Sequence, residues 1–222
     1  MSAPEPGTPE AAHRYGLVFA LAFVMVVFLI AAPNGDWTRA VALGIEFGAL
    51  LVVIVTSRER ERVRRARGIL AGAVTAAVVL GIGLGILPAA LAYGLIALLA
   101  LVIPLSLVGG LFRLLRTKGV TAQVVSGVLA IYLFVGLLFT AVIGITAHVS
   151  DRPYFTQGTS GTVSERTYYS FTVLTTTGFG DFTAAIPVGR ALAVLEMLTG
   201  QLYLVTVIGI VVGNYAGGRR TS

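Results

Sequence analysis

A short run at residues 175–181 carries the most specific chemistry in this chain. It reads Thr-Thr-Thr-Gly-Phe-Gly-Asp and places glycines at alternate positions, Gly178 and Gly180. Glycine reaches positive φ without steric cost, so alternate glycines let successive backbone carbonyls point at one axis. Oxygens arranged in this way replace the water shell of a cation that enters a narrow pore. The run lacks the Gly-x-Gly-x-x-Gly and Gly-Lys-Ser/Thr patterns of nucleotide-binding loops.

The residues before this run predict the helix that positions it. Thr162 is followed three places later by Glu165, which is the pattern of a capping box. We expect a helix over about residues 163–175, whose C-terminal end leads into the run. The partial negative charge at that end favours a nearby cation.

Residues 168–181 read Tyr-Tyr-Ser-Phe-Thr-Val-Leu-Thr-Thr-Thr-Gly-Phe-Gly-Asp and resemble the pore helix and selectivity filter of potassium channels. The resemblance implies that the metal ion K⁺ is held by the carbonyls of Thr176, Thr177, Gly178 and Phe179. It also implies that the Thr176 hydroxyl supplies the innermost ligands. K⁺ is then the permeant ion, and no cofactor and no catalytic residue are expected.

Two further positions extend the resemblance, and two depart from it. Gly180 completes the filter, and Asp181 matches an acidic residue that raises the cation concentration at the outer mouth. Phe179 stands where most of the family has Tyr, so a hydroxyl that helps to hold the filter open is missing. Thr172 stands where some relatives carry a buried Glu behind the filter.

Composition indicates an integral membrane protein. Of 222 residues, 56% are hydrophobic and 12% are charged, whereas soluble domains have about 25% charged residues. The absence of cysteine excludes disulfides and thiolate metal sites. The net charge of +6 is no nucleic-acid signal here, because the basic residues flank apolar segments.

Six apolar segments are long enough to cross a bilayer, so the predicted fold is an all-α membrane protein with a re-entrant pore helix and filter. The segments lie at about residues 15–32, 40–56, 68–87, 88–112, 120–149 and 187–215. Six crossings place both termini on one side, and 12 of the 16 basic residues fall on that side. The positive-inside rule makes this side cytoplasmic, so the Asp181 end of the filter faces outward. We expect a multi-pass protein of the cell (inner or plasma) membrane.

Three domains are expected from this layout. Residues 1–14 form a disordered cytoplasmic N-terminus, residues 15–118 a four-helix membrane domain, and residues 119–222 a pore domain with an outer helix, pore helix, filter and inner helix. The whole resembles a bacterial six-transmembrane potassium channel of the tetrameric cation channel superfamily. One pore loop per chain implies a homotetramer.

The fourth segment lacks the charges of a voltage sensor. Residues 88–112 contain no charged side chain, and Arg113, Arg116 and Lys118 follow only at the cytoplasmic end. A membrane field does work only on charges that cross it. We therefore expect little or no voltage gating from this helix.

Residues 195–203 resemble the inner helix of bacterial potassium channels, with Gly200 at the position of the hinge glycine. A glycine there either permits bending for gating or allows close packing, and we keep both interpretations. Glu46 and Glu196 are carboxyl groups inside membrane segments, and for both a structural polar contact is the favoured interpretation.

The loop at residues 57–67 carries the densest charge in the chain. Its basic residues set the topology, and we also consider them as binding sites for anionic lipid head groups. These residues are Arg58, Arg60, Arg62, Arg64, Arg65 and Arg67.

Two alternatives to a potassium channel remain at this stage. The first is a non-selective cation channel, although such relatives usually lose the second half of the Gly-Phe-Gly-Asp pattern. The second is a subunit of a potassium transporter, although those proteins carry four degenerate pore loops in one chain. An intramembrane enzyme is set aside, because no Gly-x-Ser-x-Gly or His-Glu-x-x-His motif is present.

Overall fold

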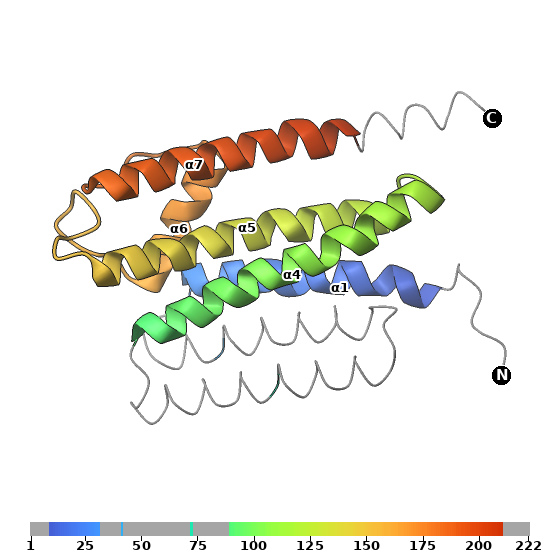
Figure 1. The fold of residues 1–222 in the computed structure, drawn as a ribbon, viewed down its shortest axis with the longest axis horizontal. Helices are drawn as coiled ribbons and strands as arrows, with labels where there is room; N and C mark the ends of the chain where they lie inside the picture. Colours follow the sequence, from blue (N-terminus) through green and yellow to red (C-terminus); the bar gives the residue numbers. More distant parts are fainter. Residues whose placement is uncertain (1–8, 32–40, 42–71, 73–88, 211–222) are drawn as a thin grey trace.

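The computed structural model describes residues 9–31, 41, 72 and 89–210, and this part of the chain is helical without a named strand. Within these described ranges there are five α-helices and one π-helical segment, with the labels of Figure 1. They are α1 (Pro9–Ala31), α4 (Ala89–Lys118), α5 (Ala122–Val149), α6 (Val163–Leu174), α7 (Pro187–Tyr203) and η1 (Leu204–Ile208).

The longest helices form one packed layer around α5. Figure 1 shows α1 and α4 running alongside α5, and the apolar core joins all three helices. Met25 of α1, Ile103 of α4 and Phe134 of α5 are each at most 1% exposed in this core. Because α1 and α4 cover it on the same chain, α5 is the central helix of the described structure.

A three-residue turn keeps α4 against its own α5. The amide of Gly119 donates to the carbonyl of Leu115 at 3.0 Å, and Gly119 has a φ of +66°. A glycine in this conformation is a common way to end a helix. Thr121 then caps α5 by accepting from the amide of Val124. So short a connection forces α4 and α5 to be antiparallel neighbours.

The short helix α6 lies at one end of the bundle, between α5 and α7 (Figure 1). Ser164 near its start donates to the carbonyl of Ile30 at 2.6 Å, so α6 is also tied to the end of α1. Pro187 occupies the first turn of α7, where its missing amide hydrogen leaves no bond unmade. The two helices are joined through residues 175–186, which include the predicted filter.

The four predicted segments that fall within the described residues are helical there. α1 begins at Pro9, inside the range of residues 1–14 that the sequence analysis assigns to a disordered terminus. Proline is favoured in a first helical turn, and Glu10, Ala11 and Ala12 after it are good helix formers. α4 continues to Lys118, beyond the predicted end of the apolar segment at about residue 112, so Arg113, Arg116 and Lys118 belong to its last turns.

Two helices in the described part are long and apolar enough to cross a membrane, namely Ala122–Val149 and Pro187–Val207. Residues Tyr15–Ala31 form a shorter apolar helix. The predicted segments at about residues 40–56 and 68–87, together with Glu46 and the arginine-rich loop, lie outside the described residues. So does the end of the inner helix beyond Ile210.

Candidate functional site: the filter segment and its supports

The capping box predicted at the start of α6 is confirmed. The Thr162 hydroxyl accepts from the Glu165 amide at 3.2 Å, and the Glu165 carboxylate accepts from the Thr162 amide at 2.6 Å. These bonds satisfy two amides that would otherwise lack partners in the first turn. The helix ends at Leu174 with Thr175 as its C-cap, and it leads directly into residues 175–181, which we call the filter segment.

Positive φ recurs at every second residue of the filter segment. The predicted positive values are found at Gly178 (φ +51°) and Gly180 (φ +82°), and Thr176 also has φ +58°. Among the described residues, Thr176 alone combines a side chain with positive φ. A β-branched residue in this conformation carries strain of about 1–3 kcal/mol, which the surroundings must offset.

Hydrogen bonds back to α6 fix the direction of the filter backbone. The amides of Thr177 and Gly178 both donate to the Thr172 carbonyl, at 2.9 and 3.1 Å. Carbonyl and amide point in opposite directions across a trans peptide bond, and no described peptide bond is cis. The carbonyls of Thr176 and Thr177 therefore point away from α6, on the exposed side of the filter segment.

The hydroxyl of Thr176 has a partner on the inner helix. The Gln201 side-chain amide donates to Thr176 Oγ1 at 2.9 Å. The Thr177 side chain points toward α6 instead, because its Oγ1 lies 2.9 Å from the Oγ1 of Thr175. The Thr175 hydroxyl in turn donates to the Phe171 carbonyl of α6. Neighbouring threonines thus have different roles, and Gln201 is a contact that the sequence motifs did not identify.

At the other end of the filter segment, Phe179 and Asp181 both contact Tyr168 of α6. The rings of Phe179 and Tyr168 are stacked, with centroids 6.3 Å apart, and Phe179 is otherwise 69% exposed in the single chain. The carboxylate of Asp181 interacts with the Tyr168 hydroxyl and raises its pKa, chiefly through side-chain hydrogen bonding. Tyr168 therefore holds the outer end of the segment from two sides.

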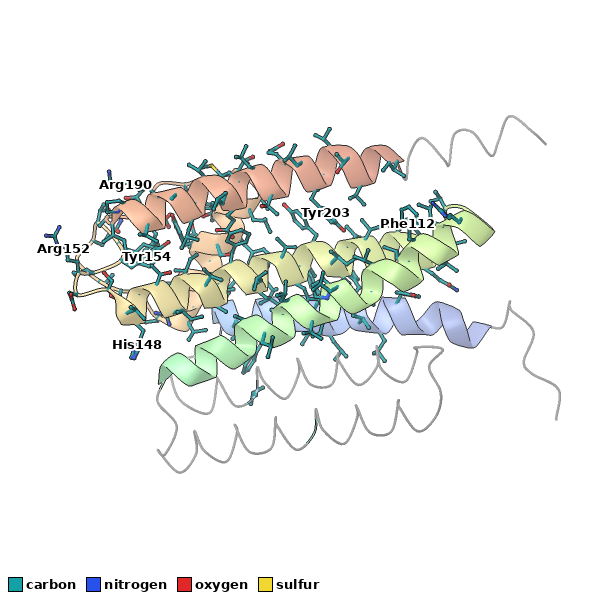
Figure 2. All side chains as sticks on the ribbon, viewed as in Figure 1. Phe112, His148, Arg152, Tyr154, Arg190 and Tyr203 are labelled. Atoms are coloured by element: carbon teal, nitrogen blue, oxygen red, sulfur yellow. The ribbon has the colours of Figure 1, made fainter. Side chains whose placement is uncertain are left out.

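The outer loop before α6 completes these supports. Gln157 donates from its side-chain amide to the Asp181 carbonyl, and the hydroxyls of Thr156 and Thr183 lie 2.6 Å apart. Phe155 pairs with Ala184 in an isolated antiparallel bridge. Beneath them Tyr154 is buried, which raises the pKa of its hydroxyl, and Figure 2 shows it within the loop end of the molecule.

Gly200 lies where α7 touches the end of α6. A Cβ added at Gly200 would be 2.1 Å from the backbone carbonyl oxygen of Leu174, so only glycine fits. This contact favours the close-packing interpretation of Gly200. The inner helix leaves α geometry farther along, in the π-helical segment η1, while bending at Gly200 stays a prediction.

Two further contacts bind α7 to α5 and α6. The hydroxyl of Tyr203 donates to the Val128 carbonyl of α5 at 2.6 Å, and Figure 2 shows Tyr203 between the two helices. Glu196 is fully buried, and its Oε1 lies 2.5 Å from the Ser170 hydroxyl of α6. The sequence interpretation of Glu196 as a structural polar contact agrees with this bond.

Comparison with known proteins supports the interpretation of this region. Residues 127–215 match the model of a protein family described as "Ion channel". In the searches of curated proteins and of solved structures, nothing matches the chain. The matched range contains most of α5, all of α6, the filter segment and α7. The family match and the helical fold together support an ion channel domain in this part of the chain.

Proposed function

We propose that this protein is a potassium-selective channel that conducts K⁺ passively across the cell membrane through a homotetrameric pore. The ligands would be the carbonyls of Thr176, Thr177, Gly178 and Phe179, with the Thr176 hydroxyl at the inner end. K⁺, membrane lipids and further copies of the chain are the partners that this proposal implies.

The observation that carries the proposal is the backbone of the filter segment. Residues 176, 178 and 180 have positive φ, and the amides of Thr177 and Gly178 are bonded back to Thr172. The carbonyls of Thr176 and Thr177 are therefore left free on the exposed side. Stacked carbonyls of this kind match the oxygen ligands that a dehydrated K⁺ requires.

The exposure of α7 supports the assembly of several copies. Only 17% of the apolar span at Pro187–Val207 is buried within the single chain, compared with 56% of the span at Ala122–Val149. Large apolar side chains of α7, including Leu195, Leu198 and Leu202, are more than half exposed. Neighbouring copies around one axis would cover much of this surface and place four filter segments face to face.

The proposed gating does not use the fourth segment as a voltage sensor. Residues 88–112 contain no charge. Arg116 lies near the end of α4, with its guanidinium 4.7 Å from the centre of the Phe112 ring. We propose six spans with both termini in the cytoplasm, so that Asp181 lies at the outer mouth and η1 lies on the cytoplasmic side of the filter segment.

The reversal potential of purified protein in planar bilayers tests the function, with K⁺ on one side and Na⁺ on the other. We expect a reversal close to the potassium equilibrium potential for wild type. Gly178→Ala should abolish selectivity, because alanine strains the positive φ that turns the filter carbonyls.

Gly158→Ala is the matched control for this experiment. Gly158 also has positive φ (+78°) and open space around it, but it lies in the outer loop. This variant should keep the wild-type reversal potential. A wild-type reversal near zero would contradict potassium selectivity and indicate a non-selective cation pore.

A further inference from the structure

The carboxyl group of Glu196 lies where three helices of the ion channel domain meet. Its side chain is 0% exposed, although most of α7 is uncovered in the single chain. Ser170 Oγ of α6 lies 2.5 Å from Glu196 Oε1 and 2.8 Å from the Gly136 carbonyl oxygen of α5. Gly136 permits the close packing of α6 on α5 at this point, because a Cβ there would come within 2.6 Å of the Phe171 ring.

The number of hydrogens at this junction identifies the form of the carboxyl group. Both oxygen–oxygen distances from Ser170 are within hydrogen-bond range, so each needs a hydrogen between the two atoms. The Gly136 carbonyl has no hydrogen to give, and serine has a single hydroxyl hydrogen. If Ser170 donates to Gly136, the hydrogen on the second contact belongs to Glu196.

The surroundings of Glu196 disfavour its ionised form. Among the residues that the structure describes, the titratable groups that interact with it electrostatically are phenols, namely Tyr132 of α5, Tyr169 of α6 and Tyr154 of the outer loop. Within the described residues, its second oxygen, Oε2, has no hydrogen-bond partner. A buried carboxylate without a cation or several donors is strongly destabilised, whereas a neutral acid is tolerated.

We propose that Glu196 is a neutral carboxylic acid that donates a hydrogen bond to Ser170 and so joins the inner helix to α6 and α5 behind the filter segment. Glu196 is a positioning residue here, since it does not reach the filter segment itself. It lies one helical turn before Gly200, which packs on the carbonyl of Leu174 directly before the filter segment. Its effect on conduction rests on the proposed function, but its protonation state does not.

This arrangement implies a dependence on pH with a definite sign. The folded protein would hold a proton on Glu196 that an exposed glutamate releases above about pH 4.3. Because the folded state binds more protons, raising the pH lowers its stability. Glutamine keeps a hydrogen-bond donor at this position but has no proton to lose, so Glu196→Gln should mimic the neutral acid at every pH.

Infrared difference spectroscopy of the purified, reconstituted full-length protein tests the protonation state without requiring conduction. At neutral pH, the wild-type minus Glu196→Gln spectrum should contain the C=O stretch of one protonated carboxylic acid. Ser170→Ala should shift this band, because the hydrogen bond is lost. Carboxylate bands in place of the acid band at neutral pH would overturn the proposal.

Potassium flux into liposomes as a function of pH then tests the positioning role. We expect wild-type flux to fall by about tenfold or more once alkaline pH ionises Glu196, because a buried bond is broken. Flux through Glu196→Gln should match wild type at neutral pH and stay level at alkaline pH. A parallel fall of flux in both proteins, or an inactive but assembled Glu196→Gln, would refute the positioning role.

An absence of K⁺ flux in wild type at every pH would instead refute the proposed function. The infrared result would then still decide the protonation state of Glu196.

Discussion

The two membrane-length helices of the ion channel domain are covered very differently. Within the single chain, 56% of the span formed by α5 is buried. Only 17% of the span at Pro187–Val207, which consists of α7 and most of η1, is buried. α5 is enclosed by α1, α4 and α6, whereas α7 is buried at Gly189, Glu196 and Gly200 alone. The difference indicates that α5 is held by its own chain, and that most of the α7 surface is available to lipid, to the proposed pore or to neighbouring copies.

The largest expected effect comes from the closest contact of α7. Gly200→Ala should destabilise the protein by about 3 kcal/mol, because the added Cβ meets a backbone atom that cannot rotate away. Thermal unfolding of the purified protein measures this. Gly209→Ala is the control in the same inner helix, since it has nothing within 4 Å. It should stabilise by about 1 kcal/mol through helix propensity. Equal gains in stability for both variants would show that Gly200 is not a packing position.

A pair of leucines tests the contrast in coverage directly. Leu137 of α5 is 1% exposed and Leu198 of α7 is 53% exposed. Leu137→Ala should cost about 2 kcal/mol, the low end for buried leucine, because transfer from water contributes little inside a bilayer. Leu198→Ala should leave the fold of the chain intact and weaken the association of copies. Thermal unfolding and detergent-resistant oligomer on gels separate the two effects, and similar results for both variants would remove the contrast.

The helix between α5 and α7 offers a smaller test. Thr162→Ala removes the capping box of α6 and should lower stability by about 1 kcal/mol. Thr199→Ala is the control, because the exposed Thr199 hydroxyl donates to the Leu195 carbonyl of its own helix and caps no helix end. It should change the midpoint of thermal unfolding very little. An equal response to both substitutions would mean that the cap does not stabilise α6.

The smallest effect on stability is expected at the contact between Gln201 and Thr176. Gln201→Leu removes one exposed hydrogen bond, worth less than about 1 kcal/mol. Its effect on K⁺ permeability should nevertheless be measurable, because this bond orients the innermost hydroxyl of the proposed filter. The effect should disappear when Thr176 is already alanine, as a double-mutant cycle would detect. Additive effects of the two substitutions would show that Gln201 acts elsewhere.

Local patterns predicted much of this structure. The capping box at Thr162 and Glu165 depends on residues three apart, and positive φ at Gly178 and Gly180 follows from the freedom of glycine itself. The approximate bounds of α4, α5 and α7 were predictable from the length of the apolar segments and from the turn residues between them. The start of α1 was missed, because the charged and proline-containing N-terminus resembles a disordered segment in composition.

The contacts that support the filter segment were not predictable in the same way. Gln201 lies 25 residues from Thr176, and Glu196 lies 26 residues from Ser170. These pairs depend on how α6 crosses α7, which no local pattern encodes. The polarity of Glu196 and Gln201 inside an apolar helix indicated that each needs a hydrogen-bond partner. It did not indicate that these partners are Ser170 and Thr176. Positive φ at Thr176 was also beyond prediction, because a β-branched residue rarely adopts it.

Equilibrium binding of K⁺ and Na⁺ to the purified protein tests the central claim most directly, because binding does not require an open gate. The oxygens around residues 176–180 should bind K⁺ in preference to Na⁺ in a calorimetric titration. Gly178→Ala should lose this preference, while Gly158→Ala keeps it. Equal binding of the two ions by wild type, or an unchanged preference in Gly178→Ala, would contradict the assignment of the filter segment.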